Sequence, residues 1–397
     1  MSRTNKFIHF GCWNNLNKPR EDGKTDMEDV MTMMNKRIKV DPVDFIVVAG
    51  DNYYPSKKNN KNISKDKQIE DKQKFILDDK LAKGFQRLQQ VHPTLEINML
   101  LGNHDLQTNS RNEEKAGPLF ITTNGVQKSE AGDCHILKKE IEESEKIDLV
   151  LNKAKMLDHG TLLLMLDSSI YTPDKTAALY LPCYAVILGE HVPDVNTLRD
   201  KQAAFVLDSI RRHKENLKHV IIIGHHPITG IKIKNKEKVF LNDIPVFAEL
   251  LRKIHTEVND PTVKYFYLCA DLHLYQKGIV TIKTDTHDDM VIHQYIVGTG
   301  GTELDDPLPP DSEKKKERSP LKGIEYELVI SSNAFGYLEC DVKEMPTFQF
   351  IGVGKTKKYN GGGSRRRKTN KKRKWNSRKR NSRKRNSRVL YSVEYTG

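Results

Sequence analysis

Four stretches of the chain place side chains that can bind metals or move protons directly after a short apolar run. The clearest is residues 100–105, Leu-Leu-Gly-Asn-His-Asp, which completes the apolar run 97–101. The other three read Gly-Asp-Asn-Tyr-Tyr, Gly-His-His-Pro and Ala-Asp-Leu-His, at residues 50–54, 224–227 and 270–273. Such runs predict buried strands, and open α/β sheets carry their ligand sites at the carboxyl ends of strands. Packing alone does not account for four of these strand ends in one chain.

The side chains collected in this way are of the kinds that bind divalent metals. Carboxylate, carboxamide and imidazole groups suit zinc, iron and manganese, and a carboxylate at a central strand end can bridge two ions. Two ions about 3.5–4 Å apart would hold a phosphoryl group and turn bound water into hydroxide near neutral pH. The expected chemistry is therefore hydrolysis of a phosphate ester. The candidate residues are Asp51, Tyr54, Asn103, His104, His225, Asp271 and His273.

The elements that must position these groups alternate between strand and helix over the first two thirds of the chain. Strands are expected at residues 7–10, 45–49, 97–101, 161–166, 220–223 and 265–269. Helices are expected at residues 25–39, 75–91, 198–212 and 246–254. This alternation predicts an α/β fold with a mostly parallel sheet and right-handed crossovers. The β-rich last third is expected to form a second sheet packed on the first, from residues 279–282, 290–297, 334–342 and 347–353.

The order of these motifs resembles the calcineurin-like metallophosphoesterase superfamily, over about residues 6 to 353. Its purple acid phosphatase-like branch is the closer resemblance. Trp13 stands in the first motif, Tyr54 occupies the position of that branch's iron-binding tyrosine, and Asp200-x-Gln202 opens a helix before Gly-His-His-Pro. The resemblance implies a four-layer α/β/β/α sandwich. It also implies a phosphatase that hydrolyses a phosphomonoester or phosphodiester by attack of metal-bound hydroxide.

Carried over by position, the resemblance assigns a ligand role to five of these residues. Asp51 would bridge two divalent or mixed-valence ions of iron, zinc or manganese. Tyr54 and His273 would hold the first ion, and Asn103 and His225 would hold the second.

The resemblance also implies residues that act on the substrate without binding metal. His104 would protonate or stabilise the leaving oxygen, and Asp105 would orient His104. His226 and Asn52 would contact the substrate.

Two positions depart from the family pattern, and they leave the activity open. The first motif normally reads Gly-Asp, and here it is Gly-Cys at Cys12. The late motif normally reads Gly-His-x-His, and here Asp271 replaces the first histidine. Thiolate suits zinc and carboxylate suits manganese, iron or zinc, so both residues remain candidate ligands. The alternatives are a catalytically degenerate domain that binds nucleic acid or an acidic partner, and a nuclease.

The positive charge of the chain belongs to its last 43 residues. The net charge is +13 overall, but residues 355–397 hold 18 of the 66 basic residues and one acidic residue, Glu394. Residues 361–364 read as a flexible Gly-Gly-Gly-Ser linker, and the basic clusters of residues 365–388 have no apolar period. We therefore expect a phosphoesterase domain at residues 1–354 and a disordered basic tail at residues 355–397. Residues 355–388 would bind nucleic acid or another polyanion.

Cysteine usage and hydropathy bear on the compartment. The five cysteines are scattered and form no Cys-x-x-Cys pair, so a disulfide framework is not expected and a reducing compartment is favoured. Neither a signal peptide nor a membrane-spanning run is recognised. We expect a soluble intracellular, cytoplasmic protein without membrane contact. The tail also suits nuclear import, and it resembles tails of proteins from large DNA viruses, which would place the protein in the virion.

Overall fold

Two large sheets form the centre of the molecule. The computed structural model describes residues 5–14, 21, 23–52, 82–91, 95–106, 137–138, 141–144, 146–235, 237–284, 288–308 and 316–353. The six-stranded sheet has the order β16-β15-β1-β2-β3-β4. The eight-stranded sheet has the order β13-β14-β11-β12-β10-β7-β6-β5, and β8 and β9 form a separate hairpin.

The six-stranded sheet carries three of the predicted strands in parallel at its centre. Strands β1, β2, β3 and β4 are parallel to one another; β15 pairs antiparallel with β1, and β16 pairs antiparallel with β15. The bounds are β1 Asn5–Phe10, β2 Phe45–Ala49, β3 Glu96–Leu100, β4 Ile147–Leu149, β15 Phe335–Val342 and β16 Thr347–Val353.

The eight-stranded sheet has its own parallel centre, made of β6, β7, β10 and β12. Its remaining strands pair antiparallel on the two sides. The bounds are β5 Asn152–Leu157, β6 Thr161–Leu166, β7 His219–Ile223, β10 Lys264–Cys269, β11 Tyr275–Ile282, β12 Met290–Val297, β13 Lys316–Arg318 and β14 Ile324–Ser332. The hairpin strands are β8 Gly230–Lys234 and β9 Glu237–Leu241.

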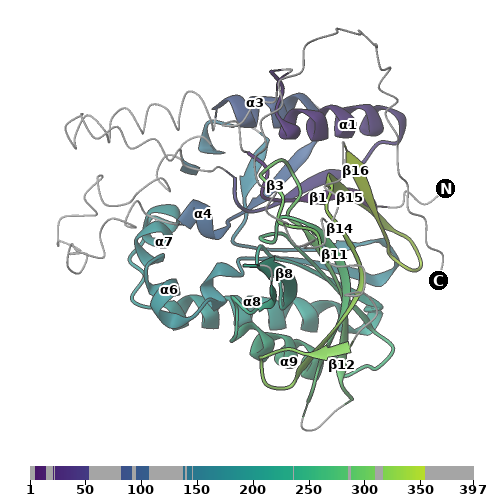
Figure 1. Ribbon diagram of the computed structural model, residues 1–397. Helices are drawn as coiled ribbons and strands as arrows, with labels where there is room; N and C mark the ends of the chain where they lie inside the picture. Colours follow the sequence, from purple (N-terminus) through teal and green to yellow (C-terminus); the bar gives the residue numbers. More distant parts are fainter. Residues whose placement is uncertain are drawn as a thin grey trace, which may run out of the picture.

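Helices cover the outer faces of both sheets, so the molecule has four layers (Figure 1). Helices α1 (Asp26–Val40) and α3 (Ala82–Val91) lie on the six-stranded sheet, and α8 (Val195–His213) and α9 (Phe247–Val258) lie on the other. Aromatic side chains join the inner faces: the rings of Tyr275 and Phe350 stack with centroids 4.2 Å apart. The predicted α/β/β/α sandwich is confirmed.

Helix α1 begins and ends where its sequence predicts. Thr25 caps it through a reciprocal pair of hydrogen bonds with Glu28, a capping box that satisfies donors at the helix start. The residues that face the sheet repeat at helical spacing, and all of them are buried: Met27, Val30, Met31, Met34 and Ile38.

The assignment of strands to sheets differs from the sequence-based prediction. The strands predicted at residues 161–166, 220–223 and 265–269 belong to the second sheet, and β15 and β16 belong to the first. An apolar run indicates a strand but not the sheet that it joins. The chain crosses between the sheets at β4 and β5, where the Lys153 ammonium donates to Glu96, Asn98 and Asp148 at 2.7, 2.7 and 3.1 Å.

The structure tests the expected helix at residues 75–91 only in part, does not describe the tail, and corrects the expectation about the cysteines. The helix expected at residues 75–91 is described only from Ala82 onward, and residues 354–397 lie outside the described part. Cys183 is disulfide-bonded, whereas Cys12, Cys269 and Cys340 are buried thiols outside any disulfide. The cysteine argument for a reducing compartment therefore loses its basis. Among the described residues, no helix combines the length and the apolar character that a membrane crossing requires.

Candidate metal centre

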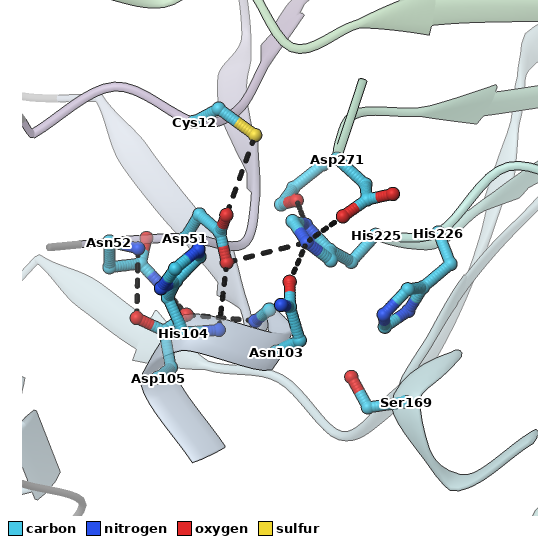
Figure 2. Close-up of polar contacts among 12 residues, drawn as sticks. Cys12, Asp51, Asn52, Asn103, His104, Asp105, Ser169, His225, His226 and Asp271 are labelled. Carbon is cyan, nitrogen blue, oxygen red and sulfur yellow. Dashed lines mark hydrogen bonds and ion pairs between the residues drawn. The ribbon is translucent and has the colours of Figure 1, made fainter. Parts of the chain in front are cut away.

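The predicted ligands come from five different strand ends at one edge of the sandwich. Cys12 follows β1, Asp51 follows β2, and Asn103 opens the short helix α4 (Asn103–Leu106) after β3. His225 follows β7 and Asp271 follows β10, in the other sheet. Because the parallel strands of both sheets end on the same side, these side chains meet across the interface between the sheets (Figure 2).

Three of these residues adopt a backbone conformation that L-amino acids rarely adopt. The φ angles of Cys12, Asp51 and Asp271 are +51°, +54° and +55°. A left-handed residue other than glycine costs of order 1–3 kcal/mol, and such residues gather at functional sites. All three lie directly beyond a strand end, where the tight turn directs the side chain toward the other ligands.

The imidazole of His225 lies at the centre of the cluster. Its Nε2 atom is 3.1 Å from Asn103 Oδ1, 3.3 Å from Asp51 Oδ1 and 3.6 Å from Asp271 Oδ1. On the opposite side of the ring, Nδ1 donates to the Ala49 carbonyl oxygen at 2.6 Å. A histidine that donates Nδ1–H to a carbonyl presents the Nε2 lone pair to a metal, as histidine ligands in metal sites commonly do.

The charges of the cluster fit a site built for a cation. Burial by itself would lower the pKa of His225, but the carboxylates of Asp51 and Asp271 outweigh it and raise the pKa to about 9. Burial likewise opposes ionisation of Asp51 and Asp271, yet His225 holds the pKa of both carboxyl groups below the usual range. A proton on Nε2 thus balances two buried carboxylates, and a metal ion that displaces the proton would take over this task.

The carboxylate of Asp51 faces two different groups of ligands. Its Oδ1 faces His225 and accepts from the His104 backbone N–H at 3.1 Å, whereas Oδ2 accepts from Cys12 Sγ at 3.7 Å. One set of potential ligand atoms, all within 4.8 Å of one another, comes from Cys12, Asp51 and His225. A second such set comes from His225, His226 and Asp271. The two sets have His225 in common, and the predicted bridging role of Asp51 stays a prediction.

His273 and Tyr54 stand apart from these sets. His273 is half-buried, its Nδ1 lies 3.0 Å from the Glu303 carbonyl oxygen, and its backbone N–H donates to Asp305 at 3.0 Å. Neither set includes His273. Tyr54 lies outside the described residues, so its predicted role stays a prediction.

The carboxylate of Asp105 joins the loops after β2 and β3. It accepts from the Asn52 backbone N–H, the Asn52 side-chain amide and the Gly102 backbone N–H, each at 2.8 Å. Burial first, and then the Asp51 carboxylate, raise the pKa of Asp105 to about 7. These contacts fix the ligand-bearing loops, and the predicted orientation of His104 by Asp105 stays a prediction.

The amide of Asn52 is engaged by the protein on both sides. Its nitrogen also donates to the Leu100 carbonyl at 2.8 Å, and its oxygen accepts from the Trp13 indole at 3.2 Å. Asn52 is buried, and its contacts are those of a cross-link between three strand ends. The predicted contact between Asn52 and substrate therefore gains no support from the geometry.

The residues of the cluster differ in their exposure to solvent. Cys12, Asp51 and His225 are fully buried, whereas Asp271 retains 17% exposure and Asn103 and His104 are half-buried. Burial lowers the pKa of His104, partly opposed by Asp51. Substrate would therefore approach from the side of Asp271 and His104.

The residues after strand β6 belong to the site, and sequence reasoning missed them. Asp167 and Ser168 are buried, and the Ser168 hydroxyl contacts the backbone of His225 and His226. The signal is the one that identifies Asp51, an apolar strand followed by polar residues, but serine is not a common metal ligand. Sequence reasoning also missed Tyr180, whose pKa is raised by burial and by Asp51 and Asp271.

The family model for the calcineurin-like phosphoesterases matches residues 6–275, which include every strand end described above. The chain belongs to the calcineurin-like phosphoesterase family. The family acts on phosphate esters with bound metal ions, and the donor set in this member fits such ions. The match does not distinguish the purple acid phosphatase-like branch.

Comparison with individual proteins adds little to the family assignment. No curated protein matches this calcineurin-like phosphoesterase significantly. A similar solved structure is described as GAP50, the anchor in the inner membrane complex of Plasmodium. It is 13% identical, has a TM-score of 0.46, and the alignment covers 90% of this chain and 89% of the other. A likeness of this degree carries no argument about function.

Proposed function

We propose that this chain is a metal-dependent phosphatase that hydrolyses a phosphomonoester or phosphodiester, with a site of the purple acid phosphatase type. The observation that carries the proposal is the convergence of three side-chain oxygens on His225 Nε2. They come from Asn103, Asp51 and Asp271, on three further strand ends and on both sheets. Burying two carboxylates side by side costs desolvation free energy, which a purely structural role does not offset.

The donor set divides into two groups of different chemistry. Asp51, Asn103, His225 and Asp271 would hold one ion with three oxygens and one nitrogen, a set that suits manganese, iron or zinc. Cys12, Asp51 and His273, with Tyr54, would hold the other, and the thiolate favours zinc. When bound, the ions supply positive charge for the phosphoryl oxygens and activate water.

The chain's own side chains would complete the reaction. His104 stands beside the cluster at the half-exposed start of α4, where its imidazole can hand a proton to the leaving oxygen. His226 belongs to the second set of potential ligand atoms, and we propose that it contacts a phosphoryl oxygen. The half-buried position of His104 agrees with an approach of substrate past Asp271.

The direct test combines metal analysis with two generic substrates. The chain, expressed with iron, zinc and manganese available, is assayed with an aryl phosphate and with the matching diester. Bound metal together with turnover of either substrate would support the proposal. A folded chain that retains no metal and turns over neither substrate would instead support the alternative of a degenerate binding domain.

We further propose that residues 355–388 bind nucleic acid or another polyanion, and that residues 1–354 form the catalytic domain. The supporting observation is the segregation of charge, because residues 1–354 carry 48 basic and 52 acidic residues. The tail, with 18 basic residues and one acidic residue, would attract the phosphate groups of a polyanion, which the near-neutral domain would not.

A further inference from the structure

The segment that follows strand β12 crosses from one sheet to the other beside the metal centre. Residues 298–302 read Gly-Thr-Gly-Gly-Thr and continue directly from Val297, the last residue of β12 in the eight-stranded sheet. Thr299 then pairs with Gly336 of β15 in the six-stranded sheet. Its carbonyl oxygen accepts from the Gly336 N–H, and its hydroxyl donates to the Gly336 carbonyl oxygen, each at 3.0 Å. The segment is therefore attached to both sheets.

The middle of this segment holds the loop that carries Cys12. The Gly300 N–H donates to the Gly11 carbonyl oxygen at 3.1 Å. The Thr302 N–H donates to the Cys12 carbonyl oxygen at the same distance. A Cβ atom on Gly300 would lie 2.6 Å from Trp13 Cβ and 2.7 Å from the Gly11 carbonyl oxygen. Carbon atoms of side chains do not approach other heavy atoms this closely, so only glycine allows the two loops to meet here.

The two ends of the segment hold the loop that carries His273. A Cβ atom on Gly298 would lie 2.1 Å from the Leu272 carbonyl oxygen, so the peptide before His273 rests directly on the glycine. The Asp305 carboxylate accepts from the His273 N–H at 3.0 Å, and the Asp305 N–H donates to the His273 carbonyl oxygen at 2.9 Å. The Glu303 carbonyl oxygen lies 3.0 Å from His273 Nδ1. The backbone and the ring of His273 are thus both in contact with this segment.

These contacts join two candidate ligands that come from different sheets. Cys12 follows β1 of the six-stranded sheet, and His273 follows β10 of the eight-stranded sheet. Pairing within either sheet therefore does not set the separation of the two loops. The left-handed conformation of Cys12 and Asp271 also costs free energy, and it persists only where the surrounding structure holds it. A segment that contacts both loops supplies such a hold.

We propose that residues 298–305 form a brace that sets the separation of Cys12 from His273, and that this separation determines how tightly the centre holds the ion that these two residues would bind. The ion belongs to the proposed function, whereas the placement of the two loops by the brace does not depend on it. Gly298, Gly300 and Asp305 contact the ligand-bearing loops through backbone groups of those loops, so they act as positioning residues.

The first experiment detects the ion at Cys12 through its sulfur ligand. The full chain is titrated with cobalt(II), which replaces zinc in protein sites and shows a sulfur-to-metal charge-transfer absorption when a thiolate binds it. Among the described cysteines, only Cys12 lies in a set of potential ligand atoms. The absorption therefore reports this ion. Its absence from the parent chain would overturn the proposal.

Two alanine variants then press on the two loops separately. Gly298→Ala would displace the loop of His273, and Gly300→Ala would displace the loop of Cys12. In both variants the cobalt affinity measured by the thiolate absorption should fall by roughly 10–100-fold, the range for groups that support metal ligands. Gly352→Ala in β16 is the matched control, because a Cβ atom there would lie 3.6 Å from its nearest neighbour, an ordinary contact. Unchanged cobalt affinity in both brace variants would overturn the proposal.

A milder pair of variants remains decisive if the alanine variants do not fold. Asp305→Asn keeps an oxygen that can accept from the His273 N–H, whereas Asp305→Ala removes it. Asp305→Asn should keep the cobalt affinity of the parent, and Asp305→Ala should lower it by about 10-fold. Urea unfolding of both chains confirms that they are folded under the conditions of the titration. Equal affinity of the folded Asp305→Ala variant and the parent would overturn the proposal.

A measurement without metal separates the brace from the proposed function. Crystal structures of the metal-free parent and Gly298→Ala chains give the distance between the Cα atoms of Cys12 and His273. A changed distance and a weakened cobalt affinity in the variant, in a chain that turns over no phosphate ester, would retain the brace and lose the function. Turnover by a chain whose variant keeps both the distance and the affinity would retain the function and lose the brace.

Discussion

The Nδ1–H of His225 donates to the carbonyl oxygen of Ala49 at 2.6 Å, and this hydrogen bond joins the two sheets of the sandwich. His225 follows β7 of the eight-stranded sheet, and Ala49 ends β2 of the other. The ligands divide in the same way, with Cys12, Asp51 and Asn103 on one sheet and His225 and Asp271 on the other. A metal bound here would therefore also act as a clamp between the sheets.

Removal of metal should lower the stability of the chain. Without an ion, the two buried carboxylates depend on the proton of His225, and the clamp between the sheets is lost. At an ion concentration about 100 times the dissociation constant, binding stabilises the folded state by about 2.7 kcal/mol. Thermal unfolding with and without a chelator measures the effect. An unchanged melting temperature after verified removal of metal would contradict the clamp.

His104→Ala should leave the metal content intact and lower turnover by roughly 10²–10⁴-fold, the range for a general acid. His104 contacts Asp51 through its backbone N–H, which the substitution keeps. Steady-state kinetics and metal analysis of the same preparation measure both effects. Equal turnover of variant and parent would remove His104 from the mechanism.

The double variant Cys12→Asp with Asp271→His should change the metal preference or raise activity. Both substitutions restore the ligand types of the family at these positions. Aspartate also adopts the left-handed conformation found at Cys12 more readily than most residues. Metal analysis after growth in defined metals, followed by the aryl phosphate assay, tests this. A folded double variant without metal, beside a parent that binds two ions, would show that the ligand assignment of Cys12 and Asp271 is wrong.

His9 should make the chain less stable in mild acid. Burial lowers the pKa of His9 to about 4, and the contact of Nε2 with the Cys269 carbonyl at 3.1 Å opposes this only in part. The unfolded chain has the ordinary pKa near 6.5, so it binds the proton first as the pH falls. The contribution of neutral His9 to the free energy of unfolding is complete above pH 6.5. It is lost as the pH falls toward 4, and the loss reaches up to about 3 kcal/mol.

Urea unfolding between pH 4 and 7 measures the contribution of His9. His9→Gln keeps a donor for the Cys269 carbonyl but cannot take up a proton in this range. Its unfolding midpoint should fall less steeply with acid than that of the parent. Parallel curves for the two chains would show that His9 does not contribute.

Truncation after Gly354 should remove polyanion binding and preserve turnover of a small substrate. If residues 355–388 make six to ten phosphate contacts, affinity should fall by roughly 10³–10⁵ between 50 and 200 mM salt. Binding of the full and truncated chains to nucleic acid across this range, beside the aryl phosphate assay, tests both statements. A truncated chain that keeps its nucleic-acid affinity, or that folds but loses turnover, would contradict the prediction.

The sequence predicted the ligand-bearing strands because a buried parallel strand is a continuous apolar run with an abrupt polar end. Strands β2, β6 and β10 are of this kind. It did not predict β5, Asn-Lys-Ala-Lys-Met-Leu, because this edge strand mixes lysines with apolar residues and has no continuous apolar run, although it pairs with the next strand, β6. The disulfide of Cys183 was not predicted either, because a disulfide requires two cysteines to lie close together in the fold, and their spacing in the sequence does not show this.

The residues that orient the ligands were harder to predict than the ligands. Asp51 and His225 have side chains whose chemistry suggests a metal, whereas Ser168 contacts the backbone N–H groups of His225 and His226. Asn52 shows the opposite error, since its place in a motif suggested a substrate contact while its amide is used by Trp13, Leu100 and Asp105.

Because its ligands stand on separate sheets, the centre would respond to how those sheets lie against each other. The stacked pair Tyr275 and Phe350 is one of the ring contacts that join the two sheets inside the sandwich. A small sliding motion at that contact would separate Asp51 from Asp271 while each sheet kept its own hydrogen bonds. Metal affinity would then depend on the relative position of the two sheets. A substitution in the core between the sheets would change this affinity without altering any ligand.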